Sequence, residues 1–169
     1  FPAPKVKVLR PGAVLTLPSA SGLRVRATPG SLVGPPWQAP ENGYVVTSAG
    51  GTSVYYEPHN DVDPAAKLAG ARADIMVSPV KAQRLPFFTL VHGADRALAL
   101  AKHLGVRHLI PLRNGDIEAE GALSSLIAAE DSLPIQKLEG MAASILGPEA
   151  PPLNIVDNRP GEPVQVEVC

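Results

Sequence analysis

Three potential metal ligands lie close together in the sequence. Glu57, His59 and Asp61 alternate with other residues and follow a short apolar run at 54–56. If the chain stays extended past this run, the three side chains project to one side of it. Carboxylate and imidazole groups together suit zinc, iron or manganese. This pattern predicts that Glu57, His59 and Asp61 bind zinc or another divalent metal, with Glu57 and His59 also placed to act as a catalytic acid–base pair.

The same residues have a simpler structural interpretation. Pro58 restricts the chain at the end of a strand, and the polar side chains around it then face water. Asp61 and Asp63 precede Pro64, which is the usual place for the residue that caps a helix. The spacing alone is compatible with both interpretations.

Five further residues are candidates for contact with a substrate. Trp37 and Gln38 lie in the proline-rich string GPPWQ, where Trp37 forms either a lip over a pocket or a plug at the edge of the core. His92 precedes a predicted helix and either faces an anion or hydrogen-bonds to the backbone. Arg113 can hold a carboxylate or phosphate, or pair with a nearby acid. Asn114 begins an Asn-Gly pair that is typical of a turn.

The composition restricts the class of protein. The 169 residues are 45% hydrophobic, which is enough for one domain with its own core, and we expect a single domain over 1–169. The formal net charge is −1 and the basic residues are scattered, so we expect neither nucleic acid nor a membrane as a partner. The single cysteine, Cys169, excludes zinc sites with several cysteines from this chain. No pattern indicates an oligomeric state, a signal peptide or a spanning segment.

Hydrophobic periodicity and turn residues predict strands that come first and helices that interleave later, which favours an α/β fold with a mixed sheet and helices on one face. The 19 prolines are separated by apolar runs, so they mark turns of a folded domain. The predicted strands are 5–9, 13–17, 23–27, 44–47, 54–56, 75–77, 106–112 and 164–168. The predicted helices are 64–73, 94–104, 121–130 and 135–146.

Three strings in the chain resemble one family. They are GPPWQAPENGY at 34–44, VYYEPHND at 54–61 and ADIMVSPVKAQRLPFFTLVHGADRALALAKHLGVRHLIPLRNGD at 73–116. They are similar to metallo-β-lactamase-fold metallo-hydrolases of plants, algae and cyanobacteria, over about 23–146. The resemblance implies the C-terminal half of an αβ/βα sandwich, with metals at one rim of two packed sheets.

The sequence departs from the family at its usual metal ligands. The His-x-His-x-Asp-His string that supplies the first ligands is absent. Where the family has a Gly-Asp pair after a strand, this chain has Glu57, Pro58 and His59. Where the family has its last histidine, this chain has Arg113 and Asn114. These departures leave an ordinary two-zinc site in doubt.

Two functions from different classes remain. The first is a metal-dependent hydrolase acting on a small-molecule substrate and incomplete without its N-terminal half. The second is a catalytically lapsed relative that serves as a binding or scaffold protein. The resemblance also implies a chloroplast location, with the cytoplasm as the alternative. Half of a sandwich leaves an apolar sheet face open, so we expect the segment alone to be marginally stable or prone to aggregate.

Overall fold

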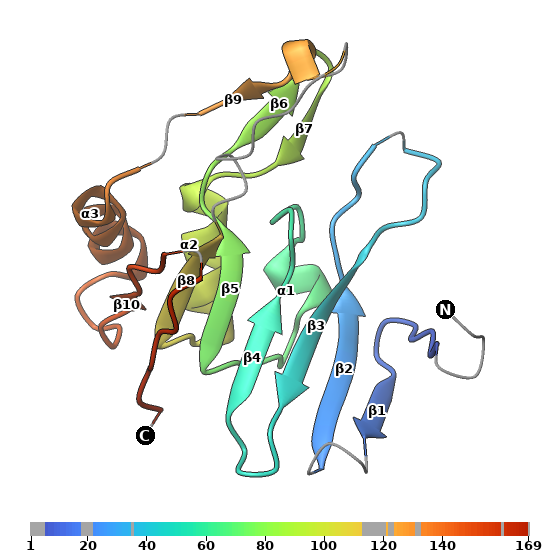
Figure 1. Ribbon diagram of the computed structural model, residues 1–169, viewed down its shortest axis with the longest axis vertical. Helices are drawn as coiled ribbons and strands as arrows, with labels where there is room; N and C mark the ends of the chain where they lie inside the picture. Colours follow the sequence, from blue (N-terminus) through green and yellow to red (C-terminus); the bar gives the residue numbers. More distant parts are fainter. Residues whose placement is uncertain are drawn as a thin grey trace.

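The computed structural model describes residues 6–17, 22–34, 36–112, 121, 124–130, 133–159 and 161–168. Within them, a mixed seven-stranded sheet forms the centre and a three-stranded sheet extends from one end of it (Figure 1). In spatial order the main sheet contains β1 (Val14–Leu17), β2 (Leu23–Pro29), β3 (Asn42–Thr47), β4 (Ser53–Tyr56), β5 (Ile75–Pro79), β8 (His108–Leu112) and β10 (Asn154–Ile155). The small sheet contains β7 (Phe88–Val91), β6 (Gln83–Leu85) and β9 (Ala128–Ala129).

Strand direction changes within the main sheet. The neighbours from β1 to β4 are antiparallel, whereas β4, β5, β8 and β10 run parallel. The carboxyl ends of the parallel strands therefore meet at one edge of the sheet, which is where loops of mixed sheets commonly carry functional groups. The turn after β4 lies at this edge.

Three helices accompany the described strands: α1 (Pro64–Lys67), α2 (Ala94–Leu104) and α3 (Ile135–Leu146). Figure 1 shows α1 and α2 behind the main sheet, and α3 beside α2. The apolar positions of α2 are buried against the sheet, and Gly105 ends the helix in the left-handed conformation that glycine adopts without strain. None of these helices, within the part of the chain described, has the length and apolar character needed to cross a bilayer.

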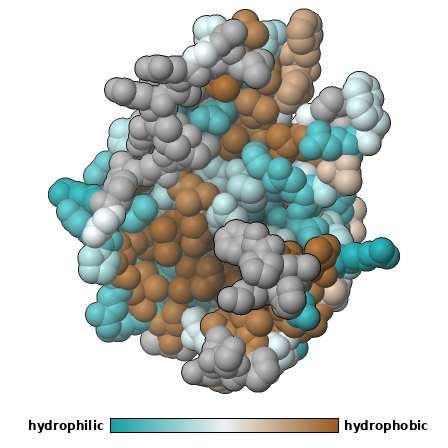
Figure 2. Space-filling view, turned by 45° about the vertical axis from the view of Figure 1, so that its right-hand side comes forward, coloured by the Kyte–Doolittle hydropathy of each residue, from teal (hydrophilic) through white to brown (hydrophobic). Residues whose placement is uncertain are grey.

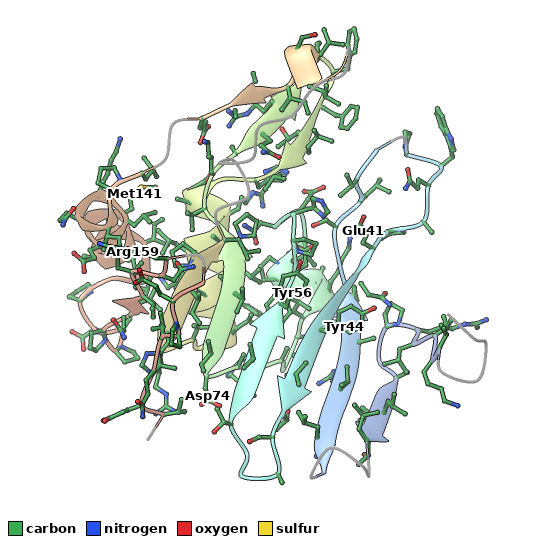
Figure 3. All side chains as sticks on the ribbon, in the orientation of Figure 1. Glu41, Tyr44, Tyr56, Asp74, Met141 and Arg159 are labelled. Carbon is green, nitrogen blue, oxygen red and sulfur yellow. The ribbon has the colours of Figure 1, made fainter. Side chains whose placement is uncertain are left out.

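The two faces of the main sheet differ in burial. Tyr55 and Met76 are paired across β4 and β5 and lie buried in the core formed with α2. The next residues, Tyr56 and Val77, point to the other face, where Tyr56 is 41% exposed. Figure 3 shows Tyr44 and Tyr56 on this open face, and Figure 2 shows hydrophobic side chains gathered on it. The structure thus has an α/β architecture with helices on one side and an incompletely covered sheet on the other.

Most predicted strands and the helices at 94–104 and 135–146 are confirmed. The strand predicted at 164–168 is wrong, because those residues have no regular structure. The strand predicted at 5–9 is also absent over its described residues, 6–9. The helix at 64–73 ends after Lys67, since the chain turns at Gly70, where φ is +73°.

The helix predicted at 121–130 is wrong over its described residues. They form a 3₁₀ turn at Ser124–Leu126 followed by β9, which pairs with β6. The sequence did not predict β6 and β7, because each is short and Pro86 lies between them. Pairing with strands distant in sequence overrides local helix propensity here.

The open sheet face generates the first prediction. We expect the 169-residue chain alone to melt below about 60 °C and to aggregate when concentrated, because apolar surface on the open face stays in contact with water. The double variant Tyr56→Ser with Val77→Thr should raise the soluble concentration measured by centrifugation. The matched control, Tyr55→Ser on the buried face, should lower the melting temperature instead. A sharp melt well above 60 °C with no aggregation would contradict the expectation.

A network of charged and polar groups joins the main sheet's parallel strands at the edge where they begin. The Asp74 carboxylate accepts hydrogen bonds from the backbone N–H and hydroxyl of Ser53, both at 2.8 Å, and from Arg107 at 2.8 Å. Desolvation by burial alone would raise the pKa of Asp74, but the Ser53 and Arg107 contacts outweigh it and hold the pKa below its usual value of 3.8. The carboxylate thus joins β4 to the segments that precede β5 and β8.

This lowered pKa predicts a pH dependence of stability. A carboxyl group whose pKa is lower in the folded state stabilises the fold above its unfolded pKa, and that contribution is lost as pH falls through the folded pKa. We expect Asp74→Asn to lower the urea midpoint at pH 7. It should also reduce the loss of stability that occurs when the pH falls below 3.8. The exposed Glu139→Gln should change neither quantity. Equal acid sensitivity of Asp74→Asn and the unmodified chain would count against this role.

Candidate functional site

The turn that follows β4 carries the predicted ligands, and Glu57 organises it from inside. The Glu57 side chain is fully buried. Its Oε1 accepts a hydrogen bond from the backbone N–H of Ser31 at 3.3 Å, and its Oε2 accepts from His59 at 3.1 Å and Asn60 at 2.5 Å. A buried carboxylate is tolerated when donors surround it in this way. In this conformation both oxygens of Glu57 hold backbone groups in place.

Asn60 bends the chain and connects three segments. Its φ is +59°, a left-handed conformation that asparagine adopts more readily than most residues. Its Nδ2 donates to the carbonyl of Pro79 at 2.7 Å, and its Oδ1 accepts from the Ser78 hydroxyl at 2.6 Å. The chain therefore does not stay extended from Glu57 to Asp61, and the expectation that Glu57, His59 and Asp61 project to one side is wrong.

The connection between β2 and β3, residues 30–41, is fastened to this turn. The Ser31 hydroxyl accepts from the backbone N–H of Asp61 at 2.7 Å, in addition to the bond from Ser31 to Glu57. The two arms of the connection meet where Glu41 N–H donates to the Ser31 carbonyl at 2.9 Å. A Cβ on Gly30 would lie 2.5 Å from the Glu41 carbonyl oxygen, so glycine is required here. We call this closure of the connection, where residues 30–31 meet Glu41, its neck.

Two histidine–carboxylate pairs lie on the solvent side of the turn. His59 Nδ1 is 3.2 Å from Glu41 Oε2, and His92 Nε2 is 3.3 Å from Asp61 Oδ1. The backbone N–H of His92 donates to the His59 carbonyl at 2.8 Å, which places the two pairs next to each other. All four side chains are partly exposed. The site is thus a polar rim with two imidazoles, each next to a carboxylate.

The residues of the rim do not by themselves form a complete metal site. No group of three or more histidine, cysteine, aspartate or glutamate side chains in the described ranges is arranged to hold a metal ion. His59 Nδ1 is buried and makes no hydrogen bond, since Glu41 lies within ion-pair distance but outside hydrogen-bond geometry. The rim can supply one or two ligands, and a complete metal site needs others.

Two further polar groups are buried close to the residues that close the β2–β3 connection. The hydroxyls of Thr28 and Tyr55 are buried beside Gly43, where a Cβ would approach them to 2.6 and 2.9 Å. Desolvation raises the pKa of the Tyr55 phenol far above its usual range, the charge of Glu57 raises it further, and the Thr28 hydroxyl opposes the rise. Neither hydroxyl makes a hydrogen bond of normal geometry. Gly43 is the residue that lets these groups pack together.

The other predicted contact residues have separate positions. Trp37 is 85% exposed, so the interpretation that it plugs the core is wrong. Gln38 folds back so that its Oε1 lies 2.7 Å from the position of a Cβ on Gly34. Arg113 and Asn114 lie outside the described residues.

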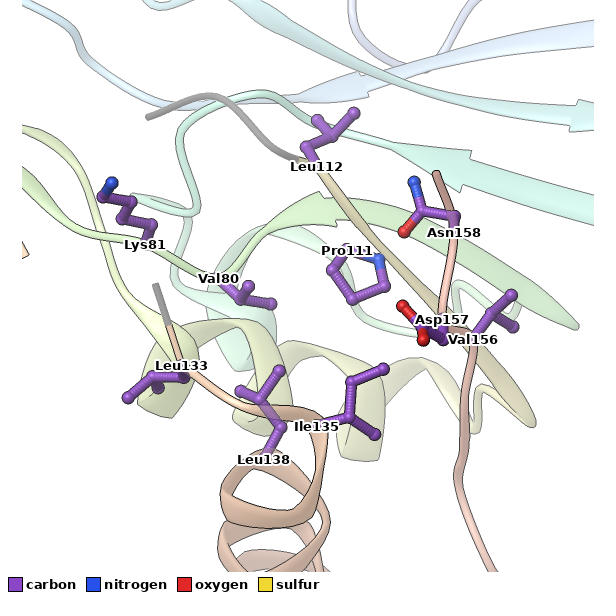
Figure 4. Close-up of a pocket in the computed structure, with 10 residues that line it drawn as sticks. All are labelled: Val80, Lys81, Pro111, Leu112, Leu133, Ile135, Leu138, Val156, Asp157 and Asn158. Atoms are coloured by element: carbon purple, nitrogen blue, oxygen red, sulfur yellow. The ribbon is translucent and has the colours of Figure 1, made fainter. Parts of the chain in front are cut away.

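A cavity of about 70 Å³ lies between the ends of β5 and β8 and the start of α3 (Figure 4). Its walls are mostly apolar, and Figure 4 shows Asp157 and Asn158 at its polar side. No residue of the two histidine–carboxylate pairs lines it. The cavity is therefore separate from the polar rim.

Comparison with known proteins identifies the family. Residues 3–113 match the family model described as a beta-lactamase superfamily domain. The chain belongs to the metallo-β-lactamase superfamily. No curated protein matches it in sequence.

Solved structures of the metallo-β-lactamase superfamily share the fold. A metallo hydrolase, Igni18, from Ignicoccus hospitalis has a TM-score of 0.61 at 15% identity, covering 95% of this chain and 60% of that one. A candidate metal-dependent hydrolase from Parabacteroides distasonis has a TM-score of 0.55 at 18% identity, covering 90% and 57%. The metallo-β-lactamase fold protein YhfI from Bacillus subtilis has a TM-score of 0.51 at 14% identity, covering 89% and 52%. This chain thus spans little more than half the length of these superfamily members.

Sequence reasoning missed the residues that shape the rim of this superfamily member. They are Ser31, Glu41, Asn60 and Ser78, which come from the β2–β3 connection, the turn after β4 and β5. Only Asn60 gave a local signal, because asparagine after Pro58 and His59 is compatible with a left-handed turn. Ser31 and Glu41 act through contacts 18 or more residues away, and no local pattern marks them.

The buried Glu57 carboxylate predicts a specific loss of stability. Glu57→Gln replaces one acceptor oxygen by an N–H₂ that faces backbone donors, so we expect the free energy of unfolding to fall by about 1–3 kcal/mol. Urea unfolding followed by circular dichroism measures it. The control is Glu41→Gln on the exposed side, where weakening the contact with His59 should cost less than about 1 kcal/mol. Equal effects of the two substitutions would contradict the assigned role of Glu57.

Proposed function

We propose that this chain forms one side of the active site of a metal-dependent hydrolase that acts on a small molecule. The observation that carries the proposal is the pair of adjacent histidine–carboxylate contacts, His59 with Glu41 and His92 with Asp61. A carboxylate next to one ring nitrogen orients the ring and leaves the other nitrogen for a ligand or a proton. Family membership supports the proposal, because similar structures are described as metallo or metal-dependent hydrolases.

In this proposal the histidines and the carboxylates of the rim have different roles. His59 and His92 supply ring nitrogens to zinc or another divalent metal or act as acid–base groups, while Glu41 and Asp61 orient them. When bound, a metal would supply a Lewis acid and lower the pKa of a water molecule to near neutrality. We do not extend the ligand role to Glu57, whose oxygens accept three backbone hydrogen bonds. Arg113 remains a candidate for holding an acidic group of the substrate.

The metal content of the protein at its full natural length tests the proposal. We expect a substantial fraction of an equivalent of zinc or another transition metal after purification without chelator, measured by elemental mass spectrometry. His59→Ala and His92→Ala should each reduce it about tenfold or more, because metal affinity falls when a ligand is removed. His108→Ala is the control, since His108 lies at the start of β8, away from the rim. Less than about a tenth of an equivalent in the unmodified protein would contradict the proposal.

A specific observation favours the second function, a binding or scaffold protein that no longer catalyses. Glu57 is committed to the backbone, and the described residues hold no group of three potential ligands. This alternative predicts no bound metal at full length and an unchanged melting temperature in His59→Ala. The metal measurement therefore separates the two functions.

The resemblance noted in the sequence also leads us to propose a plant, algal or cyanobacterial type of protein and, in plants and algae, a plastid location. A fluorescent fusion of the full-length protein in plant cells measures the location. Fluorescence restricted to the cytoplasm would contradict the plastid location and leave the hydrolase proposal unaffected.

A further inference from the structure

A cleft of about 250 Å³ lies between β2, α1 and the segment before β1, and no residue of the polar rim lines it. Two of its lining side chains are cationic, Arg26 on β2 and Lys67 on α1. No acidic side chain of the described residues lines it. The other two cavities described each have an acidic residue in their walls, Asp157 in one and Glu139 in the other. This cleft therefore carries charge of one sign.

The register of the main sheet places Arg26 on the same side as α1. Arg26 is paired with Val45, and Val45 is paired with Tyr55, which is buried in the core formed with α2. Side chains of directly paired residues project from the same face of a sheet, so Arg26 leaves the sheet on its helix side. Arg24, two residues earlier in β2, projects from the same face but does not line the cleft.

Both cationic side chains are available to a ligand. Arg26 and Lys67 are exposed, and neither forms a hydrogen bond or an ion pair with its side chain in the part of the chain that the structure describes. Asp63, the acid on the same short helix segment as Lys67, accepts hydrogen bonds from the backbone N–H groups of Ala65 and Ala66 at 3.0 and 3.3 Å. Its carboxylate is thus held at the start of α1, one turn before Lys67.

The rest of the wall is mostly apolar. Pro11 and Pro29 contribute to it from the strand side, and Leu68 and Ala71 contribute from α1 and the residues that follow it. Apolar walls keep the local dielectric constant low, and a cleft of this kind with charge of one sign concentrates counter-ions. The same walls give an alkyl group of a ligand a surface to pack on.

We propose that this cleft binds a small molecule that carries a phosphate monoester, held between Arg26 and Lys67. A phosphate monoester has a charge of about −1.5 to −2 near pH 7, which matches two cations, whereas a carboxylate neutralises only one. The guanidinium of Arg26 can donate two parallel N–H groups to phosphate oxygens, and the Lys67 ammonium adds a point charge. Because cavities for drug-sized ligands have about 300–1,000 Å³, a cleft of about 250 Å³ restricts the rest of the ligand to a short group.

The ligand would join two elements that lead to and from the candidate site. β2 continues directly into the β2–β3 connection, and α1 follows the turn after β4 by way of its capping residue, Asp63. A phosphate that bridges Arg26 and Lys67 therefore links β2 to α1 and stabilises the folded state in proportion to its binding. This inference goes beyond the hydrolase proposal and needs no metal, because none of the rim residues lines the cleft.

Isothermal titration calorimetry of the protein at its full natural length tests the proposal, with n-butyl phosphate, inorganic phosphate and butyrate as probes. We expect n-butyl phosphate to bind several-fold more tightly than inorganic phosphate, because its alkyl group leaves water. Butyrate has the same apolar character but less charge, and it should bind at least about tenfold more weakly than n-butyl phosphate. Added salt should weaken the binding of both phosphates, since the cleft is open to solvent.

Variants assign the binding to the cleft. Arg26→Gln and Lys67→Gln should each weaken the binding of n-butyl phosphate about tenfold or more, because each removes a charge-assisted hydrogen bond. Arg24→Gln is the matched control, since it removes the same charge from the same strand and face outside the cleft. All three side chains are exposed, so the melting temperature without ligand should stay unchanged. His59→Ala and His92→Ala should bind n-butyl phosphate as the unmodified protein does.

Four results would overturn the proposal. The first is a lack of saturable binding of n-butyl phosphate in the millimolar range. Weakening by Arg24→Gln equal to that by Arg26→Gln would show diffuse attraction in place of a site. Loss of binding in His59→Ala or His92→Ala would place the phosphate at the polar rim. Butyrate binding as tight as that of n-butyl phosphate would show that the cleft does not select a phosphate.

Discussion

The buried carboxylate of Glu57 is the constraint on which the candidate site depends. A carboxyl group shielded from solvent needs hydrogen-bond partners within the protein, and here the donors are backbone N–H groups of two different segments. This requirement turns the chain after β4 and draws the neck of the β2–β3 connection towards it. His59 and Asp61 are then directed outward, where Glu41 and His92 meet them. The polar rim is therefore a consequence of how one buried carboxyl group finds its hydrogen-bond partners.

The same arrangement explains why the β2–β3 connection, the turn after β4 and the end of β5 lie together. Ser31 connects the β2–β3 connection to the turn after β4, and Asn60 connects that turn to the end of β5. The small sheet follows β5 directly in the chain and returns at His92. The connection, the turn, the end of β5 and the end of the small sheet are thus joined at this edge by hydrogen bonds. The other edge is fastened separately by Asp74.

The sequence predicted the parts of the fold that depend on local periodicity. The α2 helix was predictable because its apolar stripe and its terminal glycine are visible within a dozen residues. The strands β6 and β9 were not, since both are short and β9 pairs only with β6, which is distant in sequence. The candidate site was likewise predictable only where local sequence determines it. Glu57 and His59 were identified as important by their types, but the burial of Glu57 depends on Ser31, 26 residues away, and no local pattern encodes it.

The most direct test of the account is hydrogen exchange at the backbone amides of Ser31, His59 and Asn60, followed by two-dimensional NMR. An amide bonded to a buried acceptor exchanges only when the structure opens, whereas a solvent-facing turn exchanges freely. We expect all three amides to be protected in the unmodified chain and to lose protection together in Glu57→Ala, while the amides of α2 remain protected. Rapid exchange of these three amides in the unmodified chain would contradict the account.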